Sequence, residues 1–248
     1  MRKLSTLYFI ELKLVIREIS GVLFGVVIPV GLIFLLGALY GDKTISDTSN
    51  ITMFQQAVPG VITIGLCASG LMGLPLAIAN YRDKRILRRY QVTPTSPLIL
   101  LFVQVFVQAT IAIISAALVL AVAFIFFGYS MIGSPLAFIG IYILLLLSIF
   151  SIGMLIASVS NNVNTASLLA IILYFPMFLL SGATIPFEIL PNSIQSISKV
   201  FPLTQGIILL KEVSISTSPN ISILMLILLG GIFIIFTLLS NKFFKYEY

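Results

Sequence analysis

The chain has 248 residues, of which 59% are hydrophobic and only 9% are charged, and its formal net charge is +6. Soluble domains carry about 25% charged residues, so this composition excludes a water-soluble protein and indicates a polytopic membrane protein. The single cysteine, Cys67, is expected to pack in the interior, and the lack of histidine excludes an ordinary His/Cys metal site.

The first predicted element is an amphipathic helix within residues 1–19. Charged side chains such as Lys13, Arg17 and Glu18 lie toward its end. Apolar side chains recur near helical spacing over residues 3–18, at Leu4, Leu7, Tyr8, Ile10, Leu14 and Val15. This pattern is typical of an interfacial helix that lies along the membrane surface. The alternative is that these residues are an irregular start of the first span.

Six stretches without charged residues predict an all-α protein with six transmembrane helices. About 20 residues cross the membrane as a helix, and helix is the expected form because lipid cannot satisfy free backbone groups. We expect one transmembrane domain covering residues 1–248. The predicted spans cover about residues 20–40, 57–80, 98–127, 136–158, 164–181 and 221–241.

Residues 182–220 are apolar but broken by proline, so they cannot form one straight spanning helix. We predict short re-entrant helices between spans five and six, dipping into the membrane from outside. Four charged residues are expected at the water boundary of this segment, namely Glu188, Lys199, Lys211 and Glu212.

The Lys and Arg residues are unevenly distributed between the two sides of the membrane. The side that holds both termini and the 81–97 loop carries eleven, whereas the other side carries three, Lys43, Lys199 and Lys211. Positive residues are enriched in cytoplasmic loops. The sequence therefore predicts a multi-pass protein of the cell membrane with both termini in the cytoplasm. The clustering of basic residues at span ends does not indicate nucleic-acid binding.

Several chemistries are missing from the predicted spans. No ionisable side chain lies inside them, which weakens the case for an ion-coupled carrier without excluding it. No histidine base and no paired intramembrane carboxylates are present, so no catalytic residue is predicted. No Gly-x-x-x-x-Gly-Lys loop exists, so energy from ATP would have to enter through another polypeptide.

Uncharged polar residues in the spans are candidates for a transport path. Gln55 and Gln56 lie at the start of the second span, and Gln104 and Gln108 share one face of the third. They could line a path for an amphipathic substrate, or they could form hydrogen bonds between helices. Small residues within the spans are expected to allow close helix packing, at Gly65, Gly70, Gly73 and Gly153.

The loop after the second span holds five of the fourteen Lys and Arg residues. On a helix, these five would share one arc, with Leu87 and Tyr90 on the other and Asp83 among the apolar residues. Such a helix could lie on lipid headgroups, although a carboxylate on the apolar side gains nothing there. It could equally dock into a protein partner through Asp83, Leu87 and Tyr90. Pro94 and Pro97 would end it.

The stretch Arg82-Asp83-Lys84-x-x-Leu87-Arg88-Arg89-x-x-x-Thr93-Pro94-x-Ser96 resembles a motif of ABC-2-type transporter permeases. Their loop after the second span reads roughly Arg-Glu-x-Gly-x-Leu-Lys-Arg-Leu-x-x-Thr-Pro-Leu-Ser. Arg85 stands where the family usually has Gly, and Tyr90 where it usually has Leu. The residues Leu180-Ser181-Gly182, Pro186, Leu190-Pro191 and Phe201-Pro202-Leu203-Thr204 are similar to the family's segment between spans five and six.

The resemblance implies that the chain is one half of a transmembrane unit, completed by a second copy or a homologue. A separate nucleotide-binding ATPase subunit would bind ATP and Mg²⁺, so this chain itself would hold no cofactor. The ATPase would dock on the N-terminal helix and on a coupling helix at residues 81–93, with residues 159–164 as a minor contact. The implied docking residues are Arg82, Asp83, Lys84, Leu87, Arg88, Arg89, Tyr90, Thr93 and Pro94.

These observations together predict the permease subunit of an ATP-driven exporter. Its uncharged interior favours a hydrophobic or amphipathic substrate, such as a drug, a lipid or a peptide antibiotic. A polysaccharide-exporting permease of the same family, a self-sufficient secondary carrier and a non-transporting membrane scaffold are the alternatives.

Overall fold

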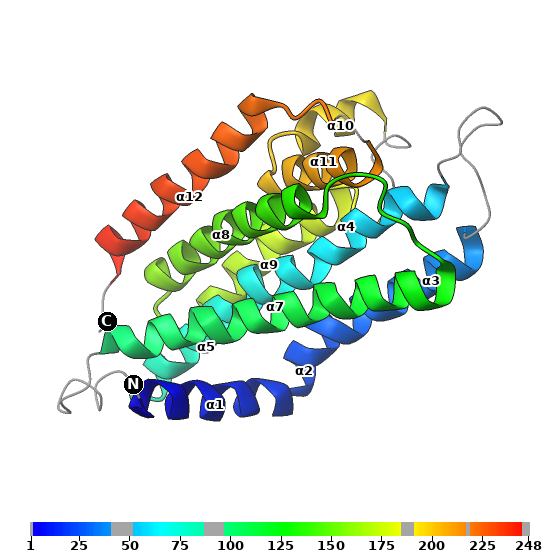
Figure 1. The fold of residues 1–248 in the computed structure, drawn as a ribbon. Helices are drawn as coiled ribbons and strands as arrows, with labels where there is room; N and C mark the ends of the chain where they lie inside the picture. Colours follow the sequence, from blue (N-terminus) through cyan, green and yellow to red (C-terminus); the bar gives the residue numbers. More distant parts are fainter. Residues whose placement is uncertain (1, 41–51, 87–96, 185–190, 217–218, 245–248) are drawn as a thin grey trace.

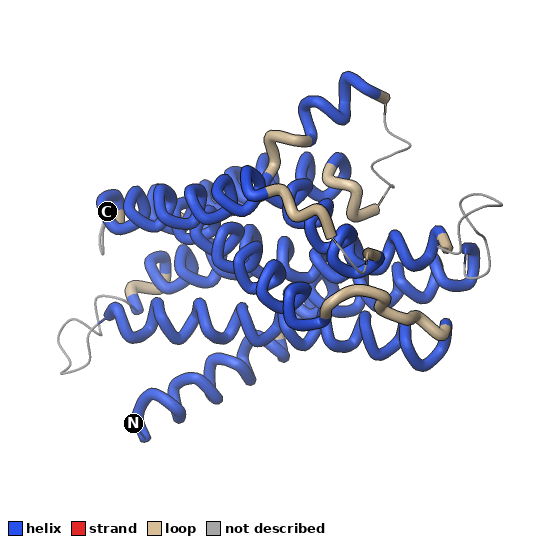
Figure 2. Tube along the Cα trace, turned by 45° about the horizontal axis from the view of Figure 1, so that its top comes forward, coloured by secondary structure: helices blue, strands red, loops and turns tan. Residues whose placement is uncertain are grey.

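The computed structural model describes residues 2–40, 52–86, 97–184, 191–216 and 219–244. These residues form an all-α bundle in which six helices are long and apolar enough to cross a membrane. The predicted fold class of a six-span all-α membrane protein is therefore confirmed. Figure 2 shows that helices account for nearly all of the described chain, with short loops between them. The elements α1 and the last turn of α12 lie at one end of the bundle, called the terminal end below (Figure 1).

Two of the six spans are interrupted and four are continuous. The first consists of α2 (Ile19–Val22), the π-helical segment η1 (Leu23–Val27) and α3 (Ile28–Tyr40). The second consists of α4 (Met53–Cys67), the π-helical segment η2 (Ala68–Gly73) and α5 (Leu74–Asp83). The others are α7 (Pro97–Phe127), α8 (Pro135–Val159), α9 (Val163–Leu180) and α12 (Ile223–Phe243).

A proline follows each π-helical segment and explains it. Pro29 and Pro75 have no backbone N–H, and their rings clash with the carbonyl four residues earlier in a regular α-helix. The residue before each proline bonds five residues back instead, from Ile28 N to the Leu23 carbonyl and from Leu74 N to the Ser69 carbonyl. Such π-bulges are a known way of accommodating proline in a membrane helix.

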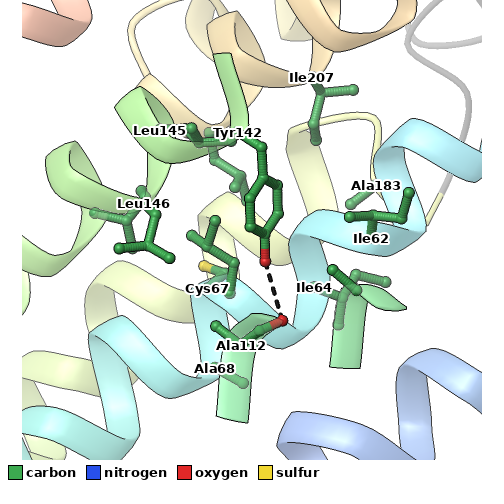
Figure 3. Packing of buried hydrophobic residues seen from close by; sticks show 14 of the residues in the cluster. Ile62, Ile64, Cys67, Ala68, Ala112, Tyr142, Leu145, Leu146, Ala183 and Ile207 are labelled. Carbon is green, nitrogen blue, oxygen red and sulfur yellow. Dashed lines mark hydrogen bonds between the residues drawn. The ribbon is translucent and has the colours of Figure 1, made fainter. Parts of the chain in front are cut away.

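The second span forms the centre of the bundle, since most of its residues are buried, whereas α12 leaves most of its surface exposed. Cys67 is buried among apolar side chains of this span and of α8, as predicted (Figure 3). In the same region, the Tyr142 hydroxyl donates a hydrogen bond of 3.0 Å to the Ala112 carbonyl and joins α8 to α7 (Figure 3). Tyr142 thus satisfies its polar group inside an apolar core.

Glycines allow the spans to approach closely, as predicted. A Cβ atom on Gly153 of α8 would lie 2.0 Å from the Gly70 carbonyl oxygen of η2. One on Gly65 would lie 2.6 Å from the Gly25 carbonyl oxygen, and one on Gly73 would lie 2.5 Å from Gln108 Oε1. Only glycine fits at these points without moving a neighbour.

The segment between spans five and six contains two helices, α10 (Asn192–Ser198) and α11 (Pro202–Ile215). They lie at the end of the bundle opposite the terminal end (Figure 1). The prediction that Lys211 lies at the water boundary is wrong, because this residue is only 9% exposed. The reason is that α11 packs on α8 and α4, which buries most of its residues. Lys199 is exposed, and Glu188 lies outside the described residues.

The N-terminal helix α1 (Arg2–Arg17) packs along α7. Val15 is buried, and Leu7 and Leu12 pack with it against Val103, Val107 and Ile111 of α7. Three of the predicted apolar residues, Leu4, Ile10 and Leu14, are exposed together with Phe9 and Ile16. The side of α1 that faces the bundle is therefore narrower than the apolar pattern indicates.

Candidate functional site

A cavity of about 340 Å³ lies between the first, second and third spans. Its wall is formed by residues of α1, α2, η1, η2 and α5. The middle of α7 and the first residue of α9 complete it. The lining residues are Val15, Glu18, Gly21, Phe24, Ala68, Ser69, Met72, Gly73, Leu76, Ala77, Asn80, Gln108 and Val163. The wall is thus mostly apolar, with a few polar groups among the aliphatic side chains.

Two of the polar groups in this wall are deeply buried. Ser69 is 4% exposed, and no hydrogen-bond partner of its hydroxyl is present among the described residues. Gln108 is 5% exposed, and its amide lies against Gly73. Buried polar groups are normally hydrogen-bonded, so the Ser69 hydroxyl at the cavity wall is suited to form a hydrogen bond with a ligand. Of the four predicted path residues, Gln108 is the one placed in this wall.

The other three glutamines have different surroundings. Gln55 forms a capping box with Thr52, in which the Thr52 N–H donates to Gln55 Oε1 and the Gln55 N–H donates to Thr52 Oγ1, both at 3.1 Å. This box begins the second span at Met53, four residues before the predicted start. Gln56 is half-buried beside it and is not among the residues lining the cavity.

Gln104 belongs to a buried polar cluster at the terminal end, together with Glu11 and Tyr81. Glu11 is 7% exposed, and its carboxylate accepts hydrogen bonds from the Tyr81 hydroxyl and, at 2.9 Å, from Gln104 Nε2. The cluster joins α1 to α5 and α7. For Gln104, interhelical bonding is therefore the interpretation that fits its position.

The start of the predicted coupling helix is bonded within the chain. Arg82 Nη1 donates to the carbonyls of Ala157 and, at 2.6 Å, Ser160, where α8 ends. The Asp83 carboxylate accepts a bond of 3.1 Å from the N–H of Val163, where α9 begins. The Val163 N–H thus gives the Asp83 carboxylate, which has no favourable contact with lipid on the predicted helix, a partner within the chain. Lys84 is exposed. The remaining docking residues, Leu87, Arg88, Arg89, Tyr90, Thr93 and Pro94, lie outside the described residues.

Arg85 adopts a backbone conformation that favours glycine. Its φ is +54°, and it follows directly after α5 has ended at Asp83 with Lys84 as the cap residue. Helices commonly end in a left-handed residue of this kind, which is usually glycine. This explains physically why a glycine is usual at this position of the motif that the loop resembles.

Replacing Arg85 by Gly should therefore stabilise the protein by about 1 kcal/mol, because a side chain is strained at positive φ. The measurement is the midpoint of thermal unfolding in detergent micelles. Lys84→Gly is the matched control, since it removes the same charge from a neighbouring residue whose φ is −81°. A rise in stability for both variants, or for neither, would contradict the backbone explanation.

Two of the features described above, the capping box and the Glu11 cluster, were not predicted from the sequence. The Thr52-x-x-Gln55 spacing is a capping-box signature that was available in the sequence. Glu11 and Tyr81 gave no comparable signal, because they are 70 residues apart and meet only in the folded bundle. Among the described residues, no group of three or more His, Cys, Asp or Glu side chains could hold a metal ion.

A protein-family model matches most of the chain. The family model described as ABC-2 type transporter matches residues 2–215, which include the cavity, the Glu11 cluster and the turn between α8 and α9. No curated protein matches the chain.

Proposed function

Because the chain belongs to the ABC-2 type transporter family, we propose that it is the permease subunit of an ATP-driven exporter. A separate ATPase subunit would bind ATP and Mg²⁺ and supply the energy. A second copy or a homologue of this chain would complete the pathway. The terminal end of the bundle would face the cytoplasm, in keeping with the eleven basic residues on that side.

The observation that carries this proposal is the cavity between the first three spans. Its wall is mostly apolar, and the buried Ser69 hydroxyl and Gln108 amide provide isolated hydrogen-bonding groups. Small-molecule sites commonly combine an apolar wall with a few polar groups that fix orientation. A hydrophobic or amphipathic substrate, such as a drug, a lipid or a peptide antibiotic, suits this wall better than a heavily hydroxylated sugar polymer.

The docking surface for the ATPase would be residues 81–93, with α1 beside them. The predicted coupling helix is not continuous over this range, because α5 ends at Asp83 and Arg85 has a φ of +54°. Support comes from the position of Lys84 and Arg85, which are exposed at the terminal end. Leu87 and Tyr90 would supply apolar contacts to the ATPase. Residues 159–164 form the turn between α8 and α9 and lie next to Asp83, so they would be part of the same surface.

The proposal is tested by co-expressing the chain with the P-loop ATPase encoded nearest to it and preparing inside-out membrane vesicles. We expect ATP-dependent uptake of a neutral amphipathic fluorescent dye. Gln108→Leu should lower the initial rate of uptake about fivefold, because it removes one buried hydrogen-bonding group worth about 1 kcal/mol. Leu87→Glu should abolish co-purification of the ATPase while membrane insertion is kept.

Phe106→Leu is the control for Gln108→Leu, since Phe106 lies on the exposed side of the same helix and is expected to leave uptake unchanged. Uptake that requires an ion gradient and no ATPase would instead establish a secondary carrier. If the ATPase co-purifies with the Leu87→Glu variant as well as with the wild type, the coupling-helix assignment is wrong.

A further inference from the structure

Arg82 and Asp83 are consecutive residues that contact the two sides of one turn. Arg82 binds the carbonyls of Ala157 and Ser160, at the end of α8. Asp83 binds the N–H of Val163, the first residue of α9. The turn between α8 and α9 is therefore held by the last two residues of the second span. We call this arrangement the turn clamp.

The charges in the turn clamp match the helix ends that they contact. The last carbonyls of an α-helix carry partial negative charge, and the first N–H groups carry partial positive charge. The guanidinium lies at the carbonyl end of α8, and the carboxylate lies at the N–H end of α9. The Asn162 side chain caps the N–H of Thr165 at 2.8 Å, so Asp83 supplies the acceptor for a different N–H in the same first turn.

The turn clamp also reaches the end of the sixth span. The Arg82 guanidinium lies over the ring of Phe244, with its carbon 4.8 Å from the ring centroid. One turn earlier, the hydroxyls of Ser158 and Ser240 are 2.7 Å apart and join α8 to α12. The ends of spans two, four, five and six thus meet around Arg82 and Asp83.

We propose that Arg82 and Asp83 are positioning residues that transmit movement of the coupling helix to α8 and α9. This inference rests on the proposed function, because it needs an ATPase that moves residues 84–93. It differs from the docking role that the sequence suggests for the same two residues. In the turn clamp, both side chains bond to backbone groups of the chain's own helices, Arg82 from a half-buried and Asp83 from an exposed position, whereas Lys84 and Arg85 are exposed beside them.

The first experiment needs no ATPase. Hydrogen–deuterium exchange is measured on the full chain in lipid nanodiscs, for amides 160–166. Asp83→Ala and Arg82→Ala should each speed exchange in this turn about tenfold, the loss expected for one charge-assisted hydrogen bond. Asp83→Lys should speed it further, because it places a positive charge at the positive end of α9. Lys84→Ala is the matched control and should leave exchange unchanged.

The second experiment uses the complex with the ATPase. Arg82→Ala and Asp83→Ala should keep ATPase co-purification at the wild-type level but lower the dye transported per ATP hydrolysed at least tenfold. This ratio is insensitive to the amount of folded protein, so a merely structural loss would not change it.

Unchanged exchange at 160–166 in both Ala variants would overturn the turn clamp itself. Faster exchange with an unchanged transport ratio would overturn the transmission role. Loss of ATPase co-purification in the Ala variants would show docking residues instead. Failure of the wild type to bind an ATPase would overturn the proposed function, and the exchange experiment would still test the turn clamp.

Discussion

Replacing Gly153 by Ala is expected to destabilise the protein by at least about 3 kcal/mol, because the new methyl group would overlap backbone. A Cβ at this position would lie 2.0 Å from the Gly70 carbonyl oxygen. Neither atom belongs to a flexible side chain, so α8 and the second span would have to separate. Since the second span is the buried centre of the bundle, the displacement would spread to α7 and α9.

Gly140→Ala is the matched control for this prediction. Gly140 lies in the same helix, and a Cβ there would meet no atom within 4 Å. Its replacement should leave stability unchanged or raise it slightly, because alanine favours helix. The measurement is equilibrium unfolding by dodecyl sulfate titration in mixed micelles. Equal midpoints for the two variants would show that the contact between Gly153 and Gly70 does not limit packing.

The second large effect is expected at Glu11. Glu11→Ala should destabilise the attachment of α1 by about 3 kcal/mol, because it removes the buried charged acceptor that the Tyr81 hydroxyl and the Gln104 amide share. The measurement is the rate of limited proteolysis within α1 in nanodiscs, followed by mass spectrometry. Faster cleavage confined to α1 is the expected result.

Glu11→Gln tests whether the effect of Glu11→Ala comes from the lost hydrogen bonds or from the lost side-chain volume. The glutamine keeps one acceptor oxygen at nearly the same position, so its effect should be much smaller than that of alanine. Glu18→Ala is the control for loss of a carboxylate from the same region, since Glu18 is exposed. If Glu11→Gln and Glu11→Ala are cleaved equally fast, the acceptor role assigned to Glu11 is wrong.

The spans and their number were predictable because apolar runs without charge have few alternatives in a membrane. The close packing at Gly153 and Gly65 was predictable too, since small residues in spans usually mark helix contacts. The partners of these glycines were not predictable, because Gly70 and Gly153 are brought together only by the arrangement of the helices. A sequence pattern predicts which face of a helix is packed. The contact itself also depends on which face of a second helix lies against it.

The candidate site was predictable in part. The sequence shows that Gln104 and Gln108 share one helix face. In the structure, Gln104 bonds to the cluster that joins α1 and α5, whereas Gln108 lines the cavity. The role of Asp83 as an acceptor at α9 was not predictable, because it depends on Val163, 80 residues away. The position of Lys211 was wrongly predicted because a charged residue in a segment interrupted by prolines suggests water contact, and the burial of α11 against α8 and α4 has no local signal in the sequence.

The π-helical segment in the second span has a consequence for every residue that follows it. In an α-helix each residue turns the chain by about 100°, so a segment that accommodates one extra residue rotates everything beyond it by that angle. Tyr81, Arg82 and Asp83 all come after η2. Deleting one residue from 68–73 would leave their identities intact but aim them at lipid or at the wrong helix. The extra residue before Pro75 thus sets the rotational register in which the end of this span meets α1, α8 and α9.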